Sequence, residues 1–246
     1  NNWGWSVESY DQRGHGHSEG PRGGLAQHDD LLRDLGAVVQ VVRHEATTGP
    51  VVLMGHSLGG LVVGGYAAGL TESRVASWLL PVDGVVMVSP ALEAPLTLLQ
   101  RGLMLTVGRL FLDMTVSTGF DPVLISRDPA VVQAYRDDPL IHDRISPRLA
   151  RFILDEGAAT LERAHRWNTP TLVVYAGADG IVHPQGSAKF VRAAPQNFVC
   201  GHAFPGLAHE ILNEPEQAEV FAVLKPWLEA QLFAWQCAQS RNLTAA

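Results

Sequence analysis

Short apolar runs alternate along the chain with longer segments in which apolar residues recur three or four positions apart. The short runs, which predict strands, are residues 6–10, 51–54, 84–88, 171–175 and 197–203. The longer segments, which predict helices, are residues 25–44, 58–70, 186–194 and 216–231. Strands that alternate with helices in this way predict an α/β fold, with a mostly parallel sheet and helices on both faces.

The run after Pro50 is apolar without interruption, from Val51 to Met54. Such a run is typical of a strand that is buried on both faces of a sheet. It leads directly into the next predicted helix at Leu58, so the connection between the two must be a tight turn.

Residues 91–166 break the alternation, because they contain no convincing strand. Apolar residues recur there at helical intervals, on more than one side of the helices that they predict: Leu92, Leu96, Leu98, Leu99, Leu103, Leu105, Leu110, Phe111, Leu112 and Met114. A helix that is apolar on several sides must be covered by something. We therefore predict a helical cap between two parts of one core, 1–90 and 167–246. The cap either faces a lipid-like substrate or only packs on the core.

Composition narrows the possible partners. Hydrophobic residues make up 46% of the 246 residues and charged residues 17%, with a net charge of −7, and the 18 Lys and Arg form no run. A nucleic-acid partner is therefore not expected. Cys200 and Cys237 allow neither a disulfide framework nor a metal-ligand spacing, which favours a reducing, cytoplasmic location and no metal. No apolar run is long enough to predict a membrane span.

Gly55-His56-Ser57-Leu58-Gly59 has the G-x-S-x-G pattern of a nucleophile elbow, and it joins a predicted strand to a predicted helix. Small residues at Gly55 and Gly59 would let the strand and helix approach closely. Ser57 would then be an exposed nucleophile at the positive end of a helix, and the N–H of Leu58 would stabilise an oxyanion. The alternative is a glycine-rich turn whose serine only caps the helix.

A serine nucleophile needs a base and an orienting acid, which follow it in the order acid, then histidine, in folds of this type. Asp179 follows the strand at 171–175, and His209 follows the last predicted strand. Glu93 is a rival acid, because it also lies after a strand end. His183 and His202 are rival bases, whereas His56 lies within the elbow itself.

These residues resemble the monoacylglycerol lipase and lysophospholipase family of α/β-hydrolases over about 4–228. The resemblance rests on the elbow and on four more segments: Asp11-Gln12-Arg13-Gly14-His15-Gly16-His17-Ser18, the segment 138–144, Ala176-Gly177-Ala178-Asp179, and His209-Glu210-Ile211-Leu212-Asn213-Glu214. It implies a lipid ester substrate such as a monoacylglycerol, a lysophospholipid or a short- to medium-chain ester. No cofactor is implied, and the apolar cap would allow transient contact with membranes or micelles.

The resemblance also implies earlier strands, and a His-Gly turn that supplies a second oxyanion donor, for which this sequence has no counterpart. We therefore expect that the N-terminal strands are missing. Three explanations stay open: the sequence is a fragment, a homo-oligomer covers the edge that these strands leave, or the activity is reduced. Alternatives to an esterase are a thioesterase, an aminopeptidase, or an impaired enzyme that serves as a binding protein.

Overall fold

The computed structural model describes residues 3–45, 49–93 and 114–244. Its central sheet has four parallel strands in the order β1-β2-β5-β6. These strands are β1 (Val52–His56), β2 (Gly84–Val88), β5 (Thr171–Ala176) and β6 (Val199–Phe204). The main helices are α1 (Asp30–Glu45), α2 (Leu58–Gly69), α4 (Pro129–Asp137), α5 (Pro147–Arg163), α6 (Pro184–Ala193) and α7 (Gln217–Thr244). Two short 3-10 helices among the described residues are η2 (Pro122–Leu124) and η3 (Ala164–Arg166).

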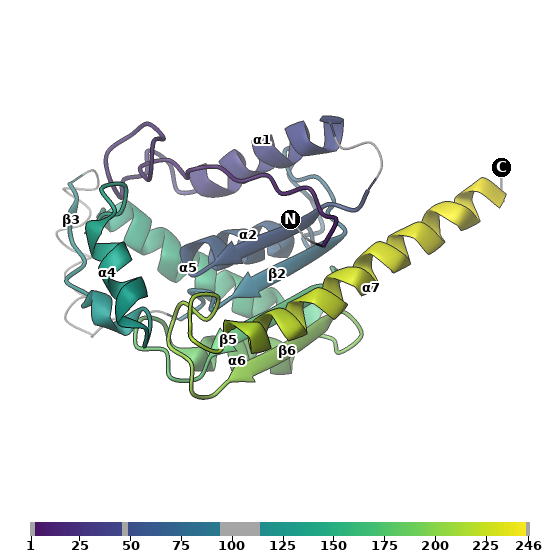
Figure 1. Cartoon of the computed structure of the whole chain (residues 1–246). Helices are drawn as coiled ribbons and strands as arrows, with labels where there is room; N and C mark the ends of the chain where they lie inside the picture. The colour runs from purple at the N-terminus through teal and green to yellow at the C-terminus, as the bar shows by residue number, and fades with distance from the viewer. Residues whose placement is uncertain (1–2, 46–48, 94–113, 245–246) are drawn as a thin grey trace.

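Helices cover both faces of the sheet (Figure 1), which confirms the predicted fold class. Strand residues alternate between the faces. Val85 and Met87 of β2 pack with α1, α2, α5 and α6, whereas Val86 and Val88 pack with α7. The second half of α7 runs on past the sheet (Figure 1), and Phe233 there is 68% exposed.

Two predictions about the first half of the core were wrong. Residues 6–10 form no strand, because no backbone hydrogen bond joins them to another described segment, and Val7 there is 76% exposed. The run at 51–54 does form a strand, but it is not buried on both faces. Since β1 lies at one end of the strand order, Met54 remains 48% exposed.

The helix predicted from residue 25 begins five residues later, at Asp30. The Asp30 carboxylate accepts hydrogen bonds from the N–H groups of Ala26 and Gln27 at 2.9 and 2.8 Å, so the chain before it is a turn. The last helix extends 13 residues beyond the predicted end at residue 231. The remaining boundaries agree within two residues, and β2 agrees at both ends.

The region 91–166 contains helices α4 and α5, as predicted, and also two short strands that were not predicted. These are β3 (Val116–Ser117) and β4 (Arg144–Ile145), which pair antiparallel. Helix α5 packs on α2, with Leu149 and Phe152 in the main core. Leu92 is buried and Met114 is exposed, while the other apolar positions from which the sequence predicted a cap lie outside the described residues. Among the described helices, none is long and apolar enough to cross a membrane.

Trp167 joins α6 to the start of β5, and its replacement tests how far the core depends on this junction. Its ring packs edge-on against Phe190 with centroids 4.8 Å apart, and its Nε1 donates to Thr171 Oγ1 at 2.8 Å. We expect Trp167→Ala to lower the free energy of unfolding by about 3–5 kcal/mol. Phe233→Ala, at an exposed position, should stay within about 0.5 kcal/mol of the wild type in urea unfolding. Equal effects of the two substitutions would contradict this packing.

Candidate active site

Ser57 lies in a strained turn between β1 and α2. Its backbone has φ +54° and ψ −118°, a conformation that residues with a side chain rarely adopt. The turn is held by hydrogen bonds from Ser57 N–H to Val88 O at 2.9 Å, and from Ala91 N–H to Ser57 O at 3.1 Å. The Ser57 side chain forms no capping hydrogen bond to α2. The structure therefore does not support the alternative in which this serine only caps the helix.

Glycines allow this turn to close, although not the pair that the sequence suggested. A Cβ at Gly55 would lie 2.1 Å from Gly59 O, and one at Gly60 would lie 3.0 Å from Pro90 Cα. A Cβ at Gly59 would meet no atom within 4 Å. The prediction for Gly55 is therefore right, whereas the close approach on the helix side requires Gly60 and not Gly59.

His209 and Asp179 form a buried pair beyond the ends of β6 and β5. His209 Nδ1 lies 2.7 Å from Asp179 Oδ2, and the two side chains are 5% and 1% exposed. Asp179 Oδ1 accepts hydrogen bonds from the N–H groups of Ile181 and Val182 at 2.8 and 3.0 Å. Because a carboxylate can only accept, it selects the imidazole tautomer with the proton on Nδ1 and leaves Nε2 as an acceptor.

His56 brings the elbow and the histidine loop into contact. Its Nε2–H donates to the backbone oxygen of His209 at 3.1 Å, and the two rings lie 4.7 Å apart. Burial, followed by repulsion from His209, lowers the pKa of His56 to about 4. His56 is therefore neutral near pH 7 and acts as a hydrogen-bond donor here. His56 directly precedes Ser57, and His209 pairs with Asp179, so this contact joins the two parts of the candidate site.

The rival residues lie in other contacts. Glu93 accepts a hydrogen bond from Lys189 Nζ at 2.5 Å, and its backbone oxygen accepts from the N–H of His183. His202 is exposed on β6 and lies against the ring of Phe204. Among the described histidines, it is His209, and not His183 or His202, that forms the hydrogen bond to Asp179. Among the described residues, no three His, Cys, Asp or Glu side chains gather as a metal site.

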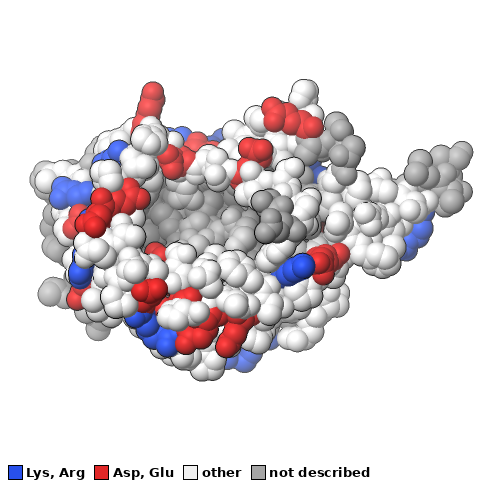
Figure 2. Space-filling model, in the orientation of Figure 1, with Lys and Arg blue, Asp and Glu red and all other residues white. Residues whose placement is uncertain are grey.

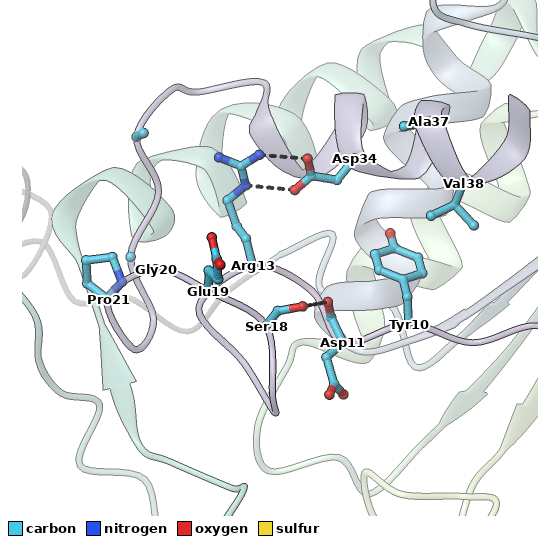
Figure 3. Close-up of a pocket in the computed structure, with 12 residues that line it drawn as sticks. Tyr10, Asp11, Arg13, Ser18, Glu19, Gly20, Pro21, Asp34, Ala37 and Val38 are labelled. Atoms are coloured by element: carbon cyan, nitrogen blue, oxygen red, sulfur yellow. Dashed lines mark hydrogen bonds and ion pairs between the residues drawn. The ribbon is translucent and has the colours of Figure 1, made fainter. Parts of the chain in front are cut away.

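Arg13 belongs to a cavity that does not contain the Ser57, Asp179 and His209 side chains. The cavity lies between residues 10–26 and α1, and Arg13 forks onto Asp34 there with two hydrogen bonds of 2.7 Å (Figure 3). A further ion pair joins Arg13 to Asp30 at 2.9 Å. With its charge taken up by two carboxylates, Arg13 fastens the segment after residue 10 to α1. Figure 2 shows that the face viewed in Figure 1 is hollowed, with charged side chains around the hollow.

Glu214 contacts the histidine loop, which the sequence did not predict. It was named only as the last residue of the segment 209–214 that carries the family resemblance. Glu214 is fully buried and accepts a hydrogen bond from the N–H of Ala208, next to His209. A glutamate after a histidine loop gives no sign of burial in the sequence, because glutamates are mostly exposed.

Comparison with known proteins gives concordant results. Residues 1–216 match the family model described as serine aminopeptidase, S33. A monoacylglycerol lipase of Mycolicibacterium smegmatis is 32% identical over 92% of this chain and 79% of its own. The crystal structure of a monoacylglycerol lipase from Paleococcus ferrophilus is 32% identical, with a TM-score of 0.80 over 94% of this chain and 86% of that one. An uncharacterized abhydrolase domain-containing protein of Dictyostelium discoideum is 30% identical over 93% of this chain, which spans 24% of its length.

Substitution of the two adjacent helical glycines tests the geometry of the elbow. Gly59→Ala should raise the free energy of unfolding by about 0.5–1 kcal/mol, because the helix gains propensity and the methyl group meets no atom. Gly60→Ala should lower it by about 1–3 kcal/mol, because the methyl group presses on Pro90. Chemical unfolding of both variants measures the difference. A Gly60→Ala variant as stable as Gly59→Ala would contradict the close approach.

The lowered pKa of His56 predicts a pH dependence of stability. In the unfolded chain the pKa returns to about 6.5, so between pH 6.5 and 4 the unfolded state binds a proton that the folded state does not. The free energy of unfolding should therefore fall as the pH falls through this window. His56 as a whole is only half-buried, and we therefore expect a contribution of about 1 kcal/mol between pH 7 and 5. His56→Gln, which keeps a donor but does not titrate, should show a smaller fall; an unchanged slope in urea titrations would refute the assignment.

Proposed function

We propose that this chain, which belongs to the α/β-hydrolase family described as serine aminopeptidase, S33, cleaves its substrate with Ser57, His209 and Asp179. The chain is a carboxylic ester hydrolase of the monoacylglycerol lipase type. The observation that supports the proposed residues best is the 2.7 Å contact between His209 and Asp179, beside a strained turn that presents Ser57.

In the proposed mechanism, His209 Nε2 takes the hydroxyl proton as Ser57 Oγ attacks the ester carbonyl carbon. Asp179 holds the imidazole in the required tautomer and stabilises its charged form. The oxyanion forms near the first turn of α2, where the N–H of Leu58 and the helix dipole favour negative charge. The protonated His209 then gives its proton to the leaving alcohol, and water hydrolyses the acyl-enzyme by the reverse sequence.

We propose monoacylglycerols, lysophospholipids or short- to medium-chain esters as substrates, in keeping with the names of the relatives. The described part of the cap exposes six large apolar side chains: Met114, Val116, Val123, Leu124, Leu140 and Ile141. Exposed apolar side chains that gather in one region are typical of surfaces that meet a partner or a lipid. They support transient contact of the cap with a micelle or membrane.

Three further expectations remain predictions. A cytoplasmic location rests on the cysteine content. Self-association along the free edge of β1 rests on the position of that strand in the sheet. The cap boundaries at 91 and 166 rest on the sequence pattern. The description of the family model also favours a peptidase. A peptidase would cleave an amide bond, whereas an esterase cleaves an ester bond.

Hydrolysis of p-nitrophenyl esters of increasing chain length by the wild type and Ser57→Ala tests the proposed function. We expect activity in the wild type and a loss of at least about 10³-fold in the variant, because no other group forms the acyl-enzyme. The chain-length optimum reports the depth of the acyl site. Thioester and amino-acid p-nitroanilide substrates, assayed in parallel, distinguish a thioesterase and an aminopeptidase. Folded wild type that cleaves no ester, or an active Ser57→Ala, would contradict the proposal.

A further inference from the structure

Glu214 is a buried carboxylate whose two oxygens are fully occupied. Oε1 accepts from Ser126 Oγ at 2.7 Å and from the N–H of Arg127 at 2.6 Å. Oε2 accepts from Arg127 Nε at 2.6 Å and from the N–H of Ala208 at 2.9 Å. The side chain is 0% exposed, so each of these four donors replaces a water that the carboxylate has lost.

This set of donors keeps the carboxylate ionised. Burial alone would raise the pKa of Glu214, but the hydrogen bonds from Ala208, Arg127 and Ser126 outweigh burial and hold it below its usual value. Hydrogen bonds to a charged acceptor are stronger than those between neutral groups, and removal of the acceptor leaves buried donors without a partner. The bond to Ala208 is therefore a firm restraint on the histidine loop.

That restraint acts on the residue before His209, and two others act beside it. The His209 carbonyl oxygen accepts from His56 Nε2 at 3.1 Å, and the N–H of Glu210 donates to Ile125 O at 2.8 Å. The backbone from Ala208 to Glu210 is thus bound at three successive points. Glu214 is the member of this group that also ties the histidine loop to the segment 126–128, ahead of α4.

We propose that Glu214 is a positioning residue that sets the His209 imidazole for catalysis and couples it to the segment 126–128. This inference rests on the proposed function of Ser57, His209 and Asp179. For catalysis, the His209 imidazole must stay within hydrogen-bond distance of both Asp179 and the Ser57 hydroxyl. A displacement of the imidazole by about 1 Å can lower the rate about 100-fold.

The chain offers a matched control, because Arg127 bridges two carboxylates. Its Nη2 pairs with Glu216, whose side chain is 40% exposed. Glu216→Gln removes the same charge from the same arginine, but Glu216 makes no contact with the histidine loop that resembles the bond from Ala208 to Glu214. If Glu214 acted only as an ion-pair partner of Arg127, Glu214→Gln and Glu216→Gln would change ester hydrolysis to a similar extent.

The experiment compares ester hydrolysis by Glu214→Gln, Glu216→Gln, the wild type and Ser57→Ala, all checked for folding. We expect Glu214→Gln to lower kcat by about 10–100-fold with KM within about twofold, because ground-state binding does not use His209. Glu216→Gln should keep kcat within about twofold. The downfield proton resonance of the His209–Asp179 hydrogen bond should shift or broaden in Glu214→Gln alone.

The outcomes separate the two levels of the proposal. An inactive wild type, or an active Ser57→Ala, contradicts the proposed function itself. If those two behave as expected, an unchanged kcat or a loss shared equally with Glu216→Gln overturns the role of Glu214. Should Glu214→Gln fail to fold, Ser126→Ala decides. That variant removes one donor on the far side of the carboxylate, and it should lower kcat several-fold at constant KM, whereas an unchanged kcat would overturn the inference.

Discussion

The parallel pairing of β1, β2, β5 and β6 is the constraint on which the candidate site depends. Parallel strands end at the same edge of a sheet, and the register here pairs Ala176 at the end of β5 with Phe204 at the end of β6. Asp179 and His209 follow these ends by three and five residues, which is close enough for their side chains to meet at 2.7 Å. Ser57 follows β1 directly, so residues far apart in the sequence are delivered to one edge.

Local interactions then convert this coarse alignment into a fixed geometry. The positive φ of Ser57 stores strain, and the backbone bonds of Ser57 to Val88 and Ala91 hold the turn. On the other side, the peptide around His209 is bound by His56, Ile125 and Glu214. Two of these partners lie outside the core strands, so the structure links the segment before α4 to the loop that carries the base.

The parts of the fold that follow from periodicity could be predicted, and those that depend on neighbours could not. Strand β2 is apolar throughout and buried on both faces, and its two ends were predicted correctly. Residues 6–10, Ser-Val-Glu-Ser-Tyr, were also predicted to be a strand, but no backbone hydrogen bond joins them to another described segment, and a short stretch of sequence does not reveal whether a partner strand is present. For the site, strand order and motif were enough to suggest Ser57, Asp179 and His209. The contact at Gly60 and the burial of Glu214 arise only when distant segments meet.

The most direct test of the account is covalent labelling of the folded protein with an alkyl phosphonate that reacts with activated serines, followed by mass spectrometry of its peptides. If His209 and Asp179 activate Ser57, the wild type should carry one adduct, on Ser57, and His209→Ala should label far more slowly while it remains folded. A folded wild type without an adduct, or an adduct on another serine, would contradict the assignment of the nucleophile. Labelling of His209→Ala at the wild-type rate would contradict the assignment of the base.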